Sequence, residues 1–387
     1  MKPFLRKAML AVSAPCVAVV LLELALRVAG FPHGYFAFFF PPREGQYPKN
    51  AEMRMTWGPI PYVIRSNNLG LRGPNVLPEK KQGAFRVATV GDSITAGFFV
   101  DNEHTWQHYL HEFLNGGSAS RFEIVNCARE GGSIDAALSQ LTKYALPLDP
   151  DIVILTFVSN DIFEILGRSE EELLQRRADI RMDLRGSVQR FLLTKTALGE
   201  AIYDGYLFLR FPSYRAKRSI MKRPVAERYN LRDGLDFKGN VEFFLNCFQR
   251  MDGLVLGDSF DERTLNAIEV YFAFLSRMSA ACREKDSRLL LVYFPAYPQI
   301  YMEQPPMLIN ETLRTGCERL DVEFLDLTPG FRAAATRTVA LHLAPIDFHP
   351  NPEGNRVFAQ LVAEYLRSTE NAEPLRGVKG KTFSETL

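Results

Sequence analysis

The stretch Phe85-Arg-Val-Ala-Thr-Val90-Gly91-Asp92-Ser93-Ile94-Thr95-Ala96-Gly97 decides the fold. Its first six residues form an apolar run rich in β-branched side chains, which predicts a buried strand that ends at Gly91. A helix should follow the turn, because apolar residues recur at helical spacing from Trp106 to Leu114. Ser93 is therefore expected at the carboxyl end of a strand, which is where open parallel sheets bind ligands.

The alternation of strand and helix continues along the rest of the chain. Further strands are predicted at residues 122–127, 151–158, 287–294 and 322–327, with helices at 133–144 and 262–283. Strands that alternate with helices predict a doubly wound α/β sheet. Residues 163–261 break the pattern and are interpreted as an insertion that caps the sheet. Its basic run at 210–223 either meets an acidic glycan or phospholipid headgroups, or is simply a solvated face.

The composition is that of a globular protein and excludes several other classes. Hydrophobic residues make up 47% and charged residues 24%, so the chain is neither disordered nor fibrous. With 46 Lys and Arg against 45 Asp and Glu, the net charge of +1 argues against a nucleic-acid partner. The five cysteines include no CxxC pair, so neither a disulfide framework nor a cysteine metal site is predicted.

The first 30 residues predict an N-terminal signal anchor. Three cations precede an apolar run at 8–22 that resumes after Glu23, and no small, neutral cleavage site follows. We therefore expect a transmembrane helix through residues 8–28, with the N-terminus in the cytoplasm and the remaining chain on the periplasmic or cell-surface side. A cleaved signal peptide and a buried helix of a cytosolic protein are the alternatives.

A serine, a histidine and an aspartate carry the predicted chemistry. Ser93 alone is a poor nucleophile and needs a positioned base. The segment Asp347-Phe-His349-Pro-Asn351 supplies one, because a histidine can take the serine proton while a carboxylate holds its ring. Taken singly, the serine is as well explained as a helix N-cap, and the histidine as a structural residue. The combination favours nucleophilic catalysis.

A histidine cluster offers a competing site. His104, His108 and His111 are spaced so that one face of a helix would carry all three, an arrangement that can ligate a metal. No carboxylate lies at a suitable spacing, and an apolar stripe lies beside them. We interpret the cluster as the polar flank of a helix and predict no metal.

Four stretches of the chain resemble the sequence blocks of the SGNH (GDSL-like) hydrolases. They are Gly91-Asp92-Ser93-Ile94, Asn126-Cys-Ala-Arg-Glu-Gly131, Ser159-Asn160-Asp161 and Asp347-Phe-His349-Pro-Asn351, in the order of the family. Two more, Ser66-Asn67-Asn68-Leu69-Gly70-Leu71-Arg72-Gly73 and Leu325-Asp-Leu-Thr-Pro329, are similar to membrane-anchored bacterial members. The resemblance covers residues 62–162 and 263–366 and leaves the insertion out.

The resemblance implies a flavodoxin-like three-layer α/β/α sandwich with an esterase or acyltransferase site. Ser93 would be the nucleophile, His349 the base and Asp347 the residue that orients the histidine. The backbone N–H groups of Ser93 and Gly131 and the side-chain amide of Asn160 would form the oxyanion hole, where each donor is worth on the order of 3 kcal/mol. No cofactor is expected.

The sequence departs from the family pattern at two positions. Val158 stands where the third block usually has glycine, and we expect it to narrow the pocket. Ile346 stands three residues before His349, where the last block often has aspartate, so Asp347 must serve instead.

The sequence as a whole predicts a membrane-anchored, extracytoplasmic serine esterase for O-acyl (acetyl) esters of a carbohydrate or an envelope lipid. An envelope O-acyltransferase with the same triad is one alternative, because water and a sugar hydroxyl compete for the same acyl-enzyme. A non-catalytic glycan-binding or assembly protein is another, but it would not need an intact triad. The expected organisation is a signal anchor at 1–30, a juxtamembrane and lead-in segment at 31–84, the hydrolase domain at 85–367 and a flexible tail at 368–387.

Overall fold

A parallel sheet forms the centre of the protein, whose computed structural model describes residues 3–29, 47–57, 60–116, 121–178, 192, 196–210, 236–335, 339–344 and 347–372. The sheet contains β3 (Phe85–Val90), β4 (Phe122–Asn126), β5 (Ile152–Phe157), β6 (Arg288–Tyr293) and β7 (Glu323–Asp326). These strands lie within the predicted ranges, and every neighbouring pair is parallel. The predicted α/β fold with a parallel sheet is therefore confirmed.

The strand order β4-β3-β5-β6-β7 places β3 at a reversal point. Thr89 of β3 pairs with Asn126 of β4 on one side, and Val90 pairs with Leu155 of β5 on the other. This is the order of flavodoxin-like sheets, which bind ligands where the strand order reverses. At that point Ser93 begins the short helix α2 (Ser93–Ala96).

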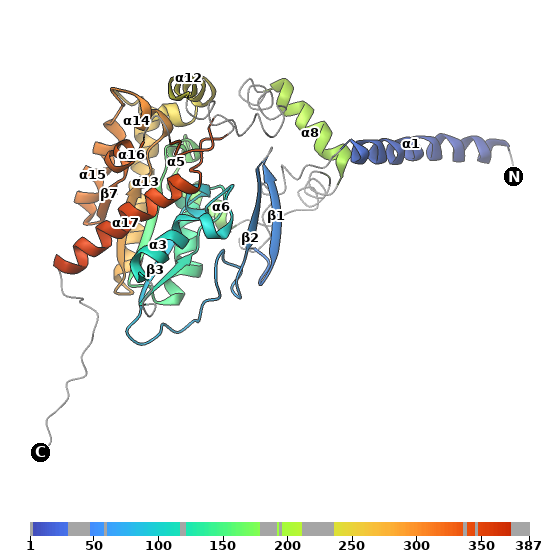
Figure 1. Ribbon diagram of the computed structural model, residues 1–387. Helices are drawn as coiled ribbons and strands as arrows, with labels where there is room; N and C mark the ends of the chain where they lie inside the picture. The colour runs from blue at the N-terminus through green and yellow to red at the C-terminus, as the bar shows by residue number, and fades with distance from the viewer. Residues whose placement is uncertain are drawn as a thin grey trace, which may run out of the picture.

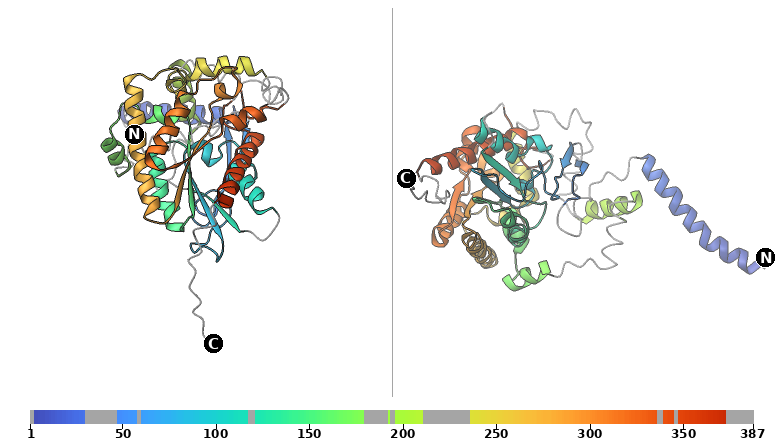
Figure 2. Two further views of the ribbon diagram at one scale, coloured as in Figure 1. Left: turned by 90° about the vertical axis from the view of Figure 1, so that its left-hand side faces the viewer. Right: turned by 90° about the horizontal axis from the view of Figure 1, so that it is seen from below.

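Helices cover both faces of the sheet and complete a three-layer sandwich (Figure 1, Figure 2). One layer consists of α3 (Trp106–Asn115), α16 (Thr328–Ala334) and α17 (Pro352–Ala372), and the other of α4 (Ile134–Gln140), α5 (Asn160–Ile165), α13 (Glu262–Arg283) and α15 (Leu308–Leu320). A separate cluster of buried apolar side chains lies beneath each layer. In the first layer, Trp106 of α3 stacks on Phe358 of α17 with ring centroids 4.4 Å apart, which joins these two helices.

The insertion is helical where the structure describes it. Its helices are α6 (Glu170–Ala178), α8 (Ala197–Arg210), α12 (Phe237–Phe248) and the single 3-10 turn η5 (Asp252–Leu254). Helix α12 packs against α14 (Tyr297–Tyr301), which follows β6 at the carboxyl edge of the sheet. Of the predicted cap, helix α12 thus lies at the edge that carries Ser93, whereas α6 contacts α4 and α13, and α8 contacts α1.

Two predicted segments lie largely outside the described residues. Of the basic run at 210–223, only Arg210 at the end of α8 is described. Helix α17 continues to Ala372, so the tail predicted from residue 368 starts inside a helix, and residues 373–387 lie outside the described part.

The N-terminal segment forms helix α1 (Pro3–Val28), which points away from the sheet (Figure 1). Within the described ranges, no helix is long and apolar enough to cross a membrane, so the predicted transmembrane helix is not supported. Glu23 interrupts its apolar surface. This carboxylate accepts hydrogen bonds from Arg27 at 2.9 Å and from the first backbone N–H groups of α8, those of Ala197 at 3.0 Å and Leu198 at 2.9 Å.

The lead-in segment contains a second sheet that the sequence did not predict. Strands β1 (Glu52–Trp57) and β2 (Ile60–Arg65) pair antiparallel and lie beside the domain (Figure 1). Tyr62 and Ile64 of β2 are buried with Phe98 and Phe99 of the loop after α2. The lead-in therefore packs directly behind the turn that carries Ser93.

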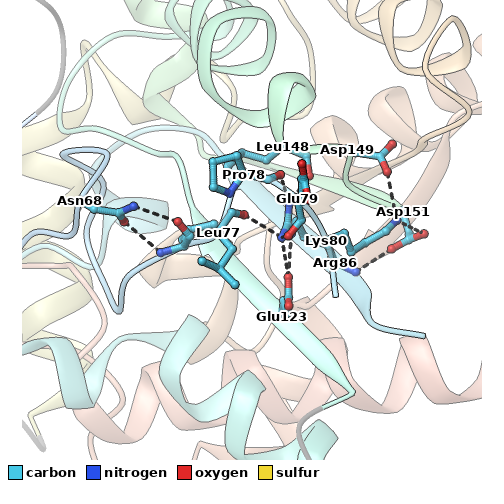
Figure 3. A network of polar contacts seen from close by, with 11 residues as sticks. Asn68, Leu77, Pro78, Glu79, Lys80, Arg86, Glu123, Leu148, Asp149 and Asp151 are labelled. Atoms are coloured by element: carbon cyan, nitrogen blue, oxygen red, sulfur yellow. Dashed lines mark hydrogen bonds and ion pairs between the residues drawn. The ribbon is translucent and has the colours of Figure 1, made fainter. Parts of the chain in front are cut away.

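A buried arginine network stabilises the opposite, amino-terminal edge of the sheet (Figure 3). Arg86 is fully buried and pairs with Glu123 at 2.7 Å. Its guanidinium also donates to backbone carbonyl oxygens, among them that of Leu77 at 3.0 Å. Asp151 accepts the Arg86 backbone N–H at 2.6 Å and the Lys80 ammonium at 2.8 Å. Every described N–H donor of the Arg86 guanidinium is hydrogen-bonded to an oxygen. We therefore interpret this edge as structural and look for the functional site at the carboxyl edge.

Candidate active site

The turn between β3 and α2 presents Ser93. Asp92 caps the helix, since its Oδ1 accepts the Ile94 N–H at 2.9 Å. Gly91 has φ +148°, and a Cβ there would lie 2.4 Å from Thr95 Oγ1. Only glycine therefore fits the position before Asp92, and this local requirement explains the Gly-Asp-Ser sequence.

Ser93, His349 and Asp347 form a hydrogen-bonded chain. His349 Nε2 lies 2.8 Å from Ser93 Oγ, and its Nδ1 lies 2.5 Å from Asp347 Oδ1. The same Oδ1 accepts the His349 backbone N–H at 3.1 Å. The structure thus brings together the three predicted catalytic residues, and an aspartate two residues before the histidine reaches its ring.

Backbone and amide hydrogen bonds fix the loop that carries His349. The Leu343 N–H donates to the His349 carbonyl at 3.0 Å. Asn351 donates from Nδ2 to the Ala340 carbonyl at 2.7 Å, while its Oδ1 accepts the Gly354 N–H at 2.9 Å in the first turn of α17. The Pro-Asn pair after His349 therefore anchors the base to the start of a long helix.

Phe99 packs against the His349 imidazole, a contact that the sequence did not predict. Its ring lies edge-on to His349 with centroids 4.8 Å apart, and its backbone has φ +65°. A bulky residue in the left-handed region is strained, and such strain persists only where the surroundings enforce it. Tyr62 of β2 packs against the same ring at 5.8 Å.

Arg72 enforces this conformation and explains the lead-in motif. It is 3% exposed, and its guanidinium donates to the carbonyl oxygens of Gly97 and Val100, on either side of Phe99. It also donates to Asn102 Oδ1 at 2.9 Å. Arg72 belongs to the stretch 66–73, which resembles membrane-anchored family members. The spacing of that stretch did not predict which groups Arg72 would bind.

The three predicted oxyanion donors follow three neighbouring strands. Ser93 follows β3, Gly131 follows β4, and Asn160 is the first residue of α5 after β5. Gly131 has φ +71°, a left-handed conformation that favours glycine. The structure places the donors on adjacent loops at the carboxyl edge, and their convergence on one oxyanion stays a prediction.

Polar contacts connect these three loops. Gln140 of α4 holds the Gly91 peptide with both ends of its amide, accepting its N–H at 2.8 Å and donating to its carbonyl at 3.0 Å. The Arg129 N–H reaches the same carbonyl at 3.4 Å. Ser133 Oγ donates to the Asp161 carbonyl at 2.8 Å. The loops after β3, β4 and β5 are thus one connected unit.

The lead-in segment also reaches the loop that carries Gly131. Tyr47 donates its hydroxyl to Glu130 Oε1, and the Arg129 guanidinium lies 4.3 Å from the Tyr47 ring centroid. Arg129 and Glu130 pair at 3.2 Å with both side chains almost fully buried. This pair restrains the residue before Gly131.

Two further carboxyl groups are buried at the site. Burial raises the pKa of Asp92 above its usual value, an effect that the positive charge of His349 opposes. Burial and the Asp92 charge hold the pKa of Asp161 well above its usual range. Asp161 Oδ2 accepts the Val158 N–H at 3.1 Å, so this residue shapes the loop before Asn160.

Val158, which replaces the glycine of the third block, packs in the core. Its side chain is 4% exposed and belongs to the buried cluster beneath α16 and α17. Its extra volume thus lies within the core, and its effect on the width of the pocket stays a prediction.

A known protein family matches part of the chain. Residues 89–231 match the GDSL-like lipase/acylhydrolase family. The match includes Ser93, Gly131 and Asn160 and ends before Asp347 and His349. No curated protein matches the chain.

Several solved structures resemble the chain at low sequence identity. An acetyl xylan esterase, AlAXEase, has 14% identity and a TM-score of 0.41, with 73% of this chain and 100% of that chain covered. A lipase/acylhydrolase from Enterococcus faecalis has 13% identity and a TM-score of 0.38, with 74% and 96% covered. TesA has 12% identity and a TM-score of 0.39, with 73% and 98% covered.

Proposed function

We propose that this serine esterase, which carries a GDSL-like acylhydrolase domain, hydrolyses O-acyl esters by nucleophilic catalysis at Ser93. The observation that carries the proposal is the chain from Ser93 Oγ through His349 to Asp347, with separations of 2.8 Å and 2.5 Å. A nucleophile bonded to a base that is itself oriented by a third group is the arrangement that acyl transfer needs.

The reaction follows from the positions of these groups. His349 Nε2 takes the Ser93 proton as Oγ attacks the acyl carbonyl, and the Asp347 carboxylate stabilises the imidazolium. The N–H groups of Ser93 and Gly131 and the Asn160 amide stabilise the oxyanion. The imidazolium then protonates the leaving alcohol, so that an acyl-enzyme remains. Water activated by His349 attacks that ester and regenerates Ser93.

The substrate class that we propose is an O-acyl ester, an acetyl ester above all, of a carbohydrate or a lipid. A site placed at the open edge of the sheet can take the alcohol part of a large molecule while only the acyl group reaches Ser93. The loop that carries Phe99 and helix α12 of the insertion lie at this edge, where such a molecule would bind.

We also propose that the domain acts outside the cytoplasm. The support is the N-terminal sequence, in which three cations precede the apolar run at 8–22. Between residues 17 and 28 of α1, most of the large apolar side chains are exposed, which is unfavourable in water.

The decisive experiment compares the purified full chain with its Ser93→Ala variant on p-nitrophenyl acetate. Removal of a nucleophile typically lowers kcat by about 10⁴-fold or more, and a fluorophosphonate probe should label only the unmodified chain. Ser169→Ala is the matched control, because Ser169 is exposed on the loop before α6. Activity and labelling that survive in Ser93→Ala would disprove the proposal.

A further inference from the structure

The insertion contacts the catalytic residues at two points, although it lies outside the sequence blocks. The first point is Phe348, which stands between Asp347 and His349. Its ring packs edge-on against Phe244 of α12 with centroids 4.8 Å apart, and against Phe248 at 5.7 Å. Helix α12 therefore forms part of the wall beside the base.

The second point is Asp252, at the start of η5. Its Oδ1 accepts a hydrogen bond from Ser159 Oγ, and Ser159 directly precedes the predicted oxyanion donor Asn160. Ser159 is buried, whereas Asp252, Asn160 and Ser93 are partly exposed. The insertion thus places a carboxylate beside the residue that precedes Asn160.

The charges of Asp92 and His349 act on the Asp252 carboxyl group. Burial raises the pKa of Asp252 to about 6, the Ser159 hydrogen bond opposes this, and the charges of Asp92 and His349 contribute with opposite signs. Above that pH the side chain is an anion beside the ester site. A carboxylate accepts about four hydrogen bonds, so those from Ser159 and from its own backbone N–H leave it able to accept others.

We propose that Asp252 is a specificity-determining residue that accepts hydrogen bonds from free hydroxyl groups of a carbohydrate O-acyl ester. The inference rests on the proposed function and decides between its two substrate classes. Hydroxyl groups donate hydrogen bonds to a partly buried carboxylate. An alkyl chain packed against the carboxylate would remove its water without replacing the hydrogen bonds, which is unfavourable. The structure therefore favours a sugar over a lipid as the alcohol part.

The test compares two acetyl esters of one sugar. In 6-O-acetylglucose the remaining hydroxyl groups are free, and in glucose pentaacetate none is. We expect Asp252→Ala to lower kcat/KM for 6-O-acetylglucose by about 10- to 100-fold, the usual effect of losing hydrogen bonds to a charged group. The loss on glucose pentaacetate and on p-nitrophenyl acetate should be smaller, because neither ester offers Asp252 a free hydroxyl group, so the preference for 6-O-acetylglucose over these two esters should fall. Asp252→Asn should have an intermediate effect, because its amide oxygen is uncharged and accepts two hydrogen bonds at most.

The control is Asp258→Asn, an exposed aspartate in the loop after η5, which should leave all three activities unchanged. Melting temperatures identify variants that merely unfold. An equal loss on all three esters would mean that Asp252 only positions the Asn160 loop, and the inference would be wrong. Hydrolysis of p-nitrophenyl acetate without hydrolysis of 6-O-acetylglucose would overturn it while leaving the proposed function intact. Survival of every activity in Ser93→Ala would instead overturn the proposed function itself.

Discussion

Replacing Asp347 by asparagine tests the triad at the position where the chain departs from its family. The change removes one charge and preserves the shape of the side chain. Asp347 Oδ1 lies 2.5 Å from His349 Nδ1, so the centres of the two charges are about 4 Å apart when the imidazole is protonated. Two unit charges at that separation and an effective dielectric constant of about 20 interact by about 4 kcal/mol. Loss of that stabilisation corresponds to about 10³-fold in kcat.

Asparagine adds a second effect on the proton position. Its NH₂ group can donate to His349 Nδ1, which forces the proton onto Nε2, the atom 2.8 Å from Ser93 Oγ. An Nε2 that carries a proton cannot accept the one from serine, so the loss can reach about 10⁴-fold. The assay is the kcat for p-nitrophenyl acetate together with the melting temperature.

Asp161→Asn is the matched control. Burial holds the pKa of Asp161 well above its usual range, so its carboxyl group resembles an uncharged amide in shape and charge. Asparagine can still accept the Val158 N–H through Oδ1, and we expect turnover within about threefold of the unmodified chain. Near-normal turnover of Asp347→Asn, with loss of turnover without unfolding in Asp161→Asn, would refute this assignment of the triad.

Three further predictions follow from other parts of the molecule. Arg72→Gln should lower the free energy of unfolding in urea by about 2–4 kcal/mol, because the buried carbonyls of Gly97 and Val100 lose their donor; an unchanged midpoint would contradict this role. Burial lowers the pKa of His342 to about 3, so the unfolded chain takes up its proton near pH 6.5 while the folded chain does not. Stability should therefore fall by up to about 1.4 kcal/mol per pH unit as the pH drops from about 6 towards 3, and His342→Phe should lack this part of the slope. Fractionation and N-terminal sequencing test the location: we expect export from the cytoplasm, and a chain found wholly in the cytosol would disprove it.

Much of the fold could be predicted because its signals are local. The strands around Val90 and Leu155 are apolar runs in the sequence, and the alternation of such runs with helices predicted a parallel sheet. Ser93 and His349 were found because each lies in a recognisable turn next to a regular element. These patterns depend only on neighbouring residues.

The supports of the site could not be predicted, because they depend on contacts between distant segments. Nothing local in the sequence indicates that Phe99 adopts a positive φ, since Arg72 enforces it from the lead-in. Asp252 belongs to an insertion without periodic pattern, and only the folded chain brings it to Ser159. At the N-terminus, the apolar composition predicted a transmembrane helix in spite of Glu23. The hydrogen bonds from α8 to Glu23 could not be predicted from the sequence either.

The distance along the chain between nucleophile and base has a consequence for biosynthesis. His349 lies 256 residues after Ser93 and immediately before α17. Until the ribosome has made residue 349, the nascent chain holds its nucleophile and the three predicted oxyanion donors, but no base. Trp106 also lacks Phe358, the ring on which it stacks. Base-assisted attack by Ser93 therefore cannot begin before residue 349 is made, and a chain truncated before Asp347 lacks both the base and the carboxylate that orients it.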